Sequence, residues 1–115
     1  MESQSDYMFR GSTDGLLLFL INEQEMTYGY QIIKEIERRS QGYLRFKEGT
    51  IYPALHKLEN QGLISGEWIE LPNGQQRRCY RITDKGKNAL DERLKAWEGF
   101  SNALNLIFKF KPSQG

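Results

Sequence analysis

The stretch from residue 49 to residue 62 constrains the fold of this chain more than any other segment. Read as a helix, it has two faces, because Ile51, Leu55 and Leu58 recur at spacings of four and three and form one apolar stripe. The side chains away from this stripe bring polar groups and no carboxylate: Thr50, Tyr52, Pro53, His56, Lys57 and Asn60. An ordinary amphipathic surface helix shows such a pattern, and so does a recognition helix that enters the major groove of DNA.

Pro53 and Gly62 limit where this helix begins and ends. Proline has no backbone N–H and fits best in the first turn, so we expect the helix to begin near Gly49 or Thr50. Glycine is common just past the last turn, so Gly62 is the expected stop.

Periodicity and turn signals predict the other elements of the chain. In order they are a helix capped by Ser12 or Thr13, a helix at 28–39 capped by Thr27, a brief strand at Leu44 and Phe46, the helix at 49–62, a β-hairpin of residues 63–71 and 77–83, and a helix at 85–108 capped by Thr83 or Asp84. This order is that of a winged helix-turn-helix, mainly α with a β-hairpin wing. The predicted divisions are a flexible N-terminus (1–11), a DNA-binding domain (12–84), a dimerisation helix (85–108) and a flexible tail (109–115).

The last predicted helix carries a heptad seam. The apolar positions follow spacings of four, three, four, three and four: Leu90, Leu94, Trp97, Ser101, Leu104 and Phe108. A long helix with so broad an apolar stripe has nothing left in this chain to cover it. We therefore expect it to pack against a second copy and form a homodimer.

Composition restricts the class of protein. With 115 residues, 38% hydrophobic and 27% charged, the chain has room for one polar globular domain. No apolar run is long enough to cross a membrane, and the lone Cys79 permits neither an intrachain disulfide nor a cysteine zinc site, so we expect a cytoplasmic protein. His56 and Cys79 lie far apart and no carboxylates cluster with metal spacing, so we expect no enzyme and no cofactor.

The predicted hairpin carries an arginine pair, Arg77 and Arg78, next to a polar turn at residues 73–76. In a wing, such residues reach phosphates or the minor groove. Residues 28–86 hold ten Lys/Arg against seven Asp/Glu, a net charge of only +3. Charge alone therefore does not establish nucleic-acid binding, whereas the architecture places the arginine pair and the polar helix face on one surface.

Four segments in order resemble the PadR family of bacterial transcriptional regulators. They read TYGYQII from residue 27, EGTIYPALHKL from residue 48, GLI from residue 62 and RRCYRITDKG from residue 77. The resemblance covers about residues 14–90, and the single helix that follows is similar to the small subfamily. It implies a homodimeric winged-helix repressor of a pseudo-palindromic operator, with these residues at the double-stranded DNA: Tyr30, Gln31, Lys34, Thr50, Tyr52, Pro53, Lys57, Arg77 and Arg78. His56 departs from the family pattern and has no assigned role.

Trp97 has two interpretations. It is a bulky residue of the dimer seam, or it stacks on a flat ligand, as a tryptophan on this helix does in some small PadR-like proteins. In the second case the ligand wall consists of Leu16, Leu17, Leu94, Trp97, Phe100 and Ser101, and the effector is a small planar aromatic molecule.

A different class of function also fits the sequence. The chain could be a small-molecule-binding or protein-interaction module that keeps the winged fold without binding an operator, because fold does not imply function. The mild net charge leaves this alternative open.

Overall fold

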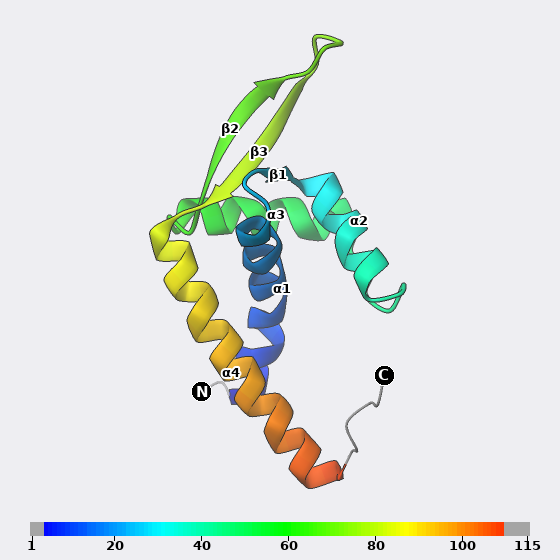
Figure 1. Ribbon diagram of the computed structural model, residues 1–115, viewed down its shortest axis with the longest axis vertical. Coiled ribbons are helices and arrows are strands. Elements are labelled where there is room, and N and C mark those ends of the chain that lie inside the picture. The colour runs from blue at the N-terminus through cyan, green and yellow to red at the C-terminus, as the bar shows by residue number, and fades with distance from the viewer. Residues whose placement is uncertain (1–3, 110–115) are drawn as a thin grey trace.

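The computed structural model describes the backbone of residues 4–109 and the side chains of residues 13–109 (Figure 1). Its elements are α1 (Gln4–Glu23), β1 (Thr27–Tyr28), α2 (Gly29–Arg39), α3 (Glu48–Asn60), β2 (Ile64–Glu70), β3 (Gln76–Ile82) and α4 (Asp84–Phe108). The three strands form one antiparallel sheet in the order β1-β3-β2. The predicted winged helix-turn-helix, mainly α with a β-hairpin wing and a long C-terminal helix, is confirmed.

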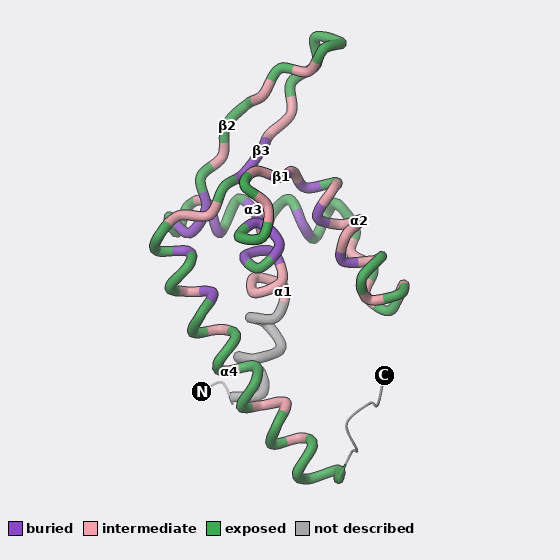
Figure 2. The backbone as a smooth tube through the Cα atoms, viewed as in Figure 1, coloured by how far each residue is buried: buried purple, intermediate pink, exposed green. Residues whose placement is uncertain are grey.

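The apolar stripe of α3 is the centre of the core. Ile51, Leu55 and Leu58 are fully buried, as predicted, and they meet α1, whose Leu17, Leu18 and Ile21 are fully buried too. Figure 2 shows burial concentrated where α1, α3 and the base of the hairpin converge, while the wing tip and the far end of α4 are exposed. Burying a large aliphatic side chain contributes about 1.5–3 kcal/mol, so this contact fixes which face of α3 points outward.

Two helices begin earlier than the capping signals predicted. Helix α1 begins at Gln4 and not at Ser12 or Thr13, because extending a helix costs much less than nucleating one. Helix α3 begins at Glu48, which puts Pro53 in its second turn. The ring removes the N–H that would bond to the carbonyl of Gly49, but Gly49 is exposed and water can replace that partner.

The predicted end of α3 holds. Gly62 has a φ of 77°, the left-handed conformation expected just past the end of α3. The predicted tail at 109–115 lies outside the described residues, apart from Lys109. The proposed division into a domain at 12–84 and a separate dimerisation helix remains a prediction.

The short strand β1 was not predicted. Thr27 pairs with Tyr80 and Tyr28 with Cys79, so β1 joins the edge of the hairpin. Thr27 therefore does not cap α2; its hydroxyl donates to Oε1 of Gln31 at 2.9 Å. Two residues are too short for an alternating pattern, and their partners lie some fifty positions away.

The brief strand predicted at Leu44 and Phe46 does not form. Both side chains pack against the core from a loop without strand structure. The alternation of Leu44 and Phe46 therefore marks two side chains that point into the core. A strand would also need an adjacent strand to receive its backbone hydrogen bonds.

The start of α4 is anchored to the turn after α3. The Thr83 hydroxyl accepts a hydrogen bond from the Gly86 N–H at 3.0 Å, as its predicted capping role requires, and donates to the Gly62 carbonyl at 2.7 Å. Gly86 is buried, and a Cβ there would lie 2.0 Å from the carbonyl oxygen of Leu63. No residue but glycine fits at this contact.

Part of α4 is covered within the chain, contrary to the prediction. Helix α1 packs along α4 (Figure 1), and Leu90 belongs to the core at 3% exposure. Arg93 also reaches Asp14 of α1 at 3.8 Å. The prediction overlooked that a first helix which is apolar nearly all round can cover two neighbours at once. Beyond Leu90, Leu94 and Trp97 remain about half exposed.

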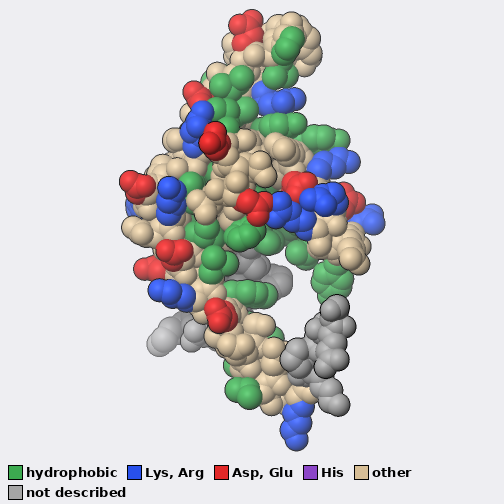
Figure 3. Space-filling model, in the orientation of Figure 1, with side chains coloured by type: hydrophobic (Ala, Val, Ile, Leu, Met, Phe, Trp, Pro, Cys, Tyr) green, Lys and Arg blue, Asp and Glu red, His purple; other side chains and the backbone are tan. Residues whose placement is uncertain are grey.

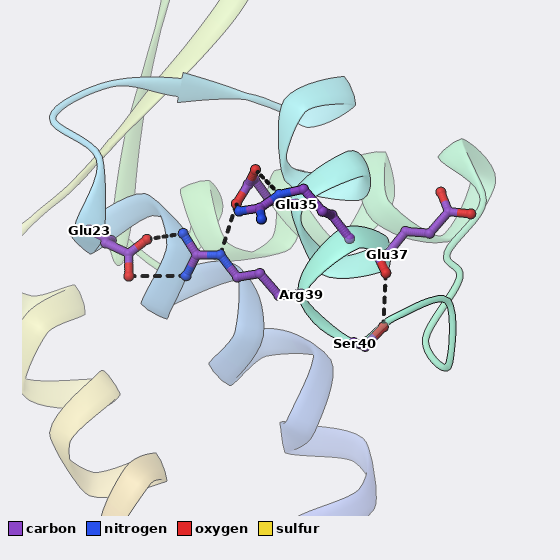
Figure 4. Close-up of polar contacts among 6 residues, drawn as sticks. Glu23, Glu35, Glu37, Arg39 and Ser40 are labelled. Carbon is purple, nitrogen blue, oxygen red and sulfur yellow. Dashed lines mark hydrogen bonds and ion pairs between the residues drawn. The ribbon is translucent and has the colours of Figure 1, made fainter. Parts of the chain in front are cut away.

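A polar cluster ties the end of α1 to the end of α2 (Figure 4). Arg39 pairs with Glu23 of α1 and, through Nε at 2.8 Å, with Glu35 of its own helix. Hydrogen bonds from Arg38 and then Arg39 lower the pKa of Glu35 from its ordinary 4.5 to about 2.

Replacing Gly86 with alanine should destabilise the fold by about 1–3 kcal/mol or more, because the added methyl group overlaps the backbone of Leu63. Gly99 lies in the same helix with nothing within 4 Å of a Cβ, so Gly99→Ala should stabilise by about 1 kcal/mol. Urea unfolding of both variants measures the difference, and equal midpoints would contradict this packing of α4.

Stability should depend on pH through Glu35. A lowered pKa means that the ion pairs contribute fully above the ordinary value of 4.5 and are lost as the pH falls toward about 2. The free energy of unfolding should therefore drop more between pH 6 and pH 3 in the wild type than in Glu35→Gln. Urea titrations at both pH values test this, with Glu25→Gln, an exposed carboxylate, as the control. Parallel losses in the two variants and the wild type would refute it.

Candidate nucleic-acid interface

A groove of about 820 Å³ lies between α3, the start of α2 and the hairpin. Its lining comes from all three: Tyr28, Gly29, Tyr30, Tyr52, His56, Glu59, Asn60, Trp68, Leu71, Gln75, Gln76, Arg77, Arg78 and Tyr80. The groove thus brings part of the polar face of α3 together with the arginine pair of the wing, which the sequence had placed on one surface, whereas Thr50, Pro53 and Lys57 lie outside its lining. Five of the lining residues are aromatic, a feature that the sequence reasoning had not noticed.

The polar face of α3 is turned to solvent. Opposite the buried stripe, these predicted DNA contacts are exposed: Thr50, Tyr52, Pro53 and Lys57. His56 is also exposed and lines the groove between Tyr52 and Glu59. The hydrogen-bonding groups of this face therefore have no competing role in the core.

Tyr52 is held against the backbone of α2. Gly29 is buried, and a Cβ there would lie 2.6 Å from Cε1 of the Tyr52 ring. Gly29 thus allows the close approach of an aromatic ring from α3. Burial, followed by the charge of Glu48, raises the pKa of Tyr52, so its hydroxyl remains a hydrogen-bond donor.

On α2, two of the three predicted contacts point outward. Tyr30 is 51% exposed, and Nζ of Lys34 lies 5.4 Å from the centre of its ring. Gln31 is half-buried and accepts the hydrogen bond from Thr27. Tyr30, which lines the groove, and Lys34 beside it are therefore available to a ligand, whereas Gln31 is engaged with the start of its own helix.

The adjacent arginines of the wing, Arg77 and Arg78, have different environments. The guanidinium of Arg77 lies 3.8 Å from the ring centre of Tyr28. The Nη2 atom of Arg78 donates to Oε2 of Glu59 at 2.5 Å, and its guanidinium lies 5.5 Å from the ring centre of Trp68. Among the described residues, Arg78 has a carboxylate partner and Arg77 has none.

Glu59 was missed as a residue of this surface. It was placed away from the polar face, yet it lines the groove at half-buried exposure. The signal was in the periodicity, since Tyr52, His56 and Glu59 follow at spacings of four and three and share one face of a helix. Figure 3 shows the same mixture on a larger scale, with acidic and basic side chains interspersed over the winged domain on this face.

The structure assembles only part of the predicted ligand wall. On α4, the rings of Trp97 and Phe100 lie 6.0 Å apart at 44°. Leu17 is fully buried in the core and Leu16 packs against it, so Leu17 cannot line a surface wall, and its predicted role is corrected. The physical reason is the packing of α1 described above for α4: Leu17 is one of the α1 side chains that enter the core of the same domain.

The described part of the chain also bears on metal binding and on membrane insertion. No three His, Cys, Asp or Glu side chains there are placed to hold a metal ion. None of its helices is long and apolar enough to cross a bilayer. Cys79 is a free, buried thiol in β3, and burial raises its pKa.

Comparison with known proteins agrees with this geometry. Residues 17–92 match the model of the transcriptional regulator PadR-like family. The chain is 41% identical to the transcriptional regulator Rv3488 of Mycobacterium tuberculosis over 71 residues, 62% of this chain and 63% of that protein. A transcriptional regulator structure from Clostridium thermocellum superposes with a TM-score of 0.76 at 32% identity, covering 84% of this chain and 92% of the other.

One similar structure contains nucleic acid. Bacillus subtilis PadR in complex with operator DNA superposes with a TM-score of 0.64 at 26% identity, over 70% of this chain and 45% of that one. The family match, the winged-helix fold and the groove between α3 and the wing agree with one another. The chain belongs to the PadR-like family of transcriptional regulators.

Proposed function

We propose that this chain acts as a homodimeric repressor, with its two winged domains on the half-sites of a pseudo-palindromic operator. The observation that carries the proposal is the single surface that joins the exposed face of α3 to Arg77 of the wing across the groove. The operator complex of Bacillus subtilis PadR supports it, because that protein shares this fold. The protein then works in the cytoplasm, where its DNA lies.

The chemistry of the surface assigns roles within this proposal. Thr50 and Tyr52 carry hydroxyls that can bond base edges in the major groove. Lys34, Lys57 and Arg77 are exposed or half-exposed cations without a carboxylate partner among the described residues, and they suit phosphates. With so few free cations per subunit, non-specific affinity should be modest, and operator choice should rely on two copies binding together.

The second part of the proposal is dimerisation through α4. From Leu94 onward this helix exposes large apolar side chains at 43–80%: Leu94, Trp97, Leu106 and Ile107. Large apolar side chains left exposed along a helix mark a candidate interaction site. A second copy is the natural partner, since a palindromic operator requires two-fold symmetry. Ser101, Leu104 and Phe108 belong to the proposed seam, whereas Leu90 serves the core.

The most detailed part of the proposal concerns a small-molecule effector. Trp97 and Phe100 form a pair of rings on the exposed side of α4, and aromatic rings of this kind stack on flat ligands. A planar aromatic molecule in the seam would change the separation of the two α3 helices, and half-sites about 34 Å apart make that separation matter. The ligand would release the operator to the extent that it binds the dimer with the changed separation more tightly than the dimer that fits the operator.

DNA binding should depend on the Tyr52–Gly29 contact. Gly29→Ala should push the Tyr52 ring off its position and weaken binding to the promoter region of its own gene about tenfold, as Tyr52→Ala should. Lys57→Ala should weaken binding and reduce the slope of log K against log salt by about 0.9 per subunit. Fluorescence anisotropy at several salt concentrations measures both effects.

Gly99→Ala is the matched control, because it makes the same change in a helix remote from the groove and should bind as the wild type does. Circular dichroism shows that each variant is folded. If the wild type gives no footprint on this DNA at low salt, the operator proposal is wrong and the binding module without an operator becomes the better interpretation.

Dimerisation and ligand binding should both involve Trp97. Ligand binding is tested in a Trp68→Phe background, where quinoline should quench the fluorescence of the remaining tryptophan, Trp97. Dimerisation is tested by sedimentation equilibrium, in which Trp97→Ala should weaken self-association about tenfold or more, because buried aromatic side chains dominate interfaces. An unchanged mass for the variant would refute the seam. Quenching without any change in operator affinity would refute release by an effector.

A further inference from the structure

We propose that Arg78 is a positioning residue that holds the wing against α3 through Glu59, a contact we call the latch, and that of this arginine pair Arg77 is the member that binds phosphate. The family resemblance had placed both arginines at the DNA. The part of this inference that concerns affinity rests on the proposed operator binding, whereas the latch itself is a property of the free protein.

The contacts of Arg78 span three elements. It projects from β3, where it is paired directly with Trp68 of β2, and lies over the Trp68 ring. From there it donates to Glu59 in the last turns of α3 at 2.5 Å. One side chain thus connects both strands of the hairpin to the recognition helix.

Gly66 makes room for this arrangement. A Cβ at this position of β2 would lie 2.8 Å from Nε and 2.9 Å from Nη2 of Arg78, closer than real contacts come. The guanidinium therefore occupies the space that a side chain at position 66 would fill. This packing leaves the side chains of Arg78 and Glu59 only 28% and 25% exposed.

Charge separates the two arginines further. The charge of Arg78 is compensated by Glu59, and pulling it to a phosphate would leave that carboxylate three-quarters buried without a partner, which is costly. Arg77 stacks on Tyr28 and has no carboxylate partner among the described residues. It can neutralise a phosphate without breaking an ion pair.

The latch matters because the hairpin extends far beyond its base. Figure 1 shows β2 and β3 reaching away from the helices. Among the described residues, the strand that pairs with this hairpin is β1, which meets β3 at Cys79 and Tyr80. Without the Arg78–Glu59 contact, the outer hairpin could swing about that base. A loosened wing would still reach the DNA, but ordering it there would cost free energy on each binding event.

The test compares Arg78→Met with Arg77→Met, which remove the same charge from neighbouring positions. Arg78→Met should lower operator affinity about fivefold to tenfold with an unchanged salt slope. Arg77→Met should reduce that slope by about 0.9 per subunit. Glu59→Gln should lower operator affinity as much as Arg78→Met does. The double variant should have no lower an affinity than either single variant, because both substitutions remove the same contact. Equal losses of slope in the two arginine variants would overturn the proposal.

A second measurement needs no DNA. In a Trp97→Phe background, acrylamide should quench Trp68 more strongly in Arg78→Met and in Glu59→Gln, because Trp68 is 62% exposed and the guanidinium 5.5 Å from its ring centre no longer shields part of the ring. Arg77→Met should leave quenching unchanged. If Arg78→Met does not fold, Arg78→Lys replaces it in this test. Lysine keeps the charge but lacks the planar guanidinium, so this variant should also increase quenching of Trp68. Unchanged quenching in both Arg78 variants would overturn the latch. A protein that shows the quenching pattern but binds no DNA would keep the latch and refute the proposed function.

Discussion

The burial of one stripe on α3 is the constraint on which the rest of the structure depends. Ile51, Leu55 and Leu58 are fully buried against α1, and a helix that buries one face has only the opposite face to offer. The exposed hydroxyls and the ammonium group of that face follow from this contact. So does the position of the groove, because the hairpin begins directly where α3 ends.

Helix α1 links the core to the proposed interface between subunits. Its apolar side chains face α3 on one side and α4 on the other, and Leu90 of α4 enters the same core. The winged domain and the exposed half of α4 are therefore joined by packed helices and not by a free linker. A change at the seam has a continuous packed route to α3, since closely packed interiors transmit strain.

Much of the candidate site followed from the sequence, and the omissions have a common cause. The face of α3, the hairpin and the cap at Thr83 depend on neighbours within a few residues, which periodicity and turn chemistry detect. Strand β1, the pairing of Arg78 with Glu59 and the Gly29–Tyr52 contact join positions far apart in the chain. A local sequence pattern does not reveal that residues so far apart in the chain are in contact.

By itself, the sequence determined the class of fold and the side of α3 that faces solvent, because a run of apolar residues at helical spacing has one energetically acceptable orientation. It did not decide which charges on that surface are free. Arg77 and Arg78 are identical side chains on adjacent residues, and alternation along β3 sends them to different partners, Tyr28 and Glu59. Only the tertiary structure made this distinction, because the availability of a charge depends on what lies within a few ångströms of it.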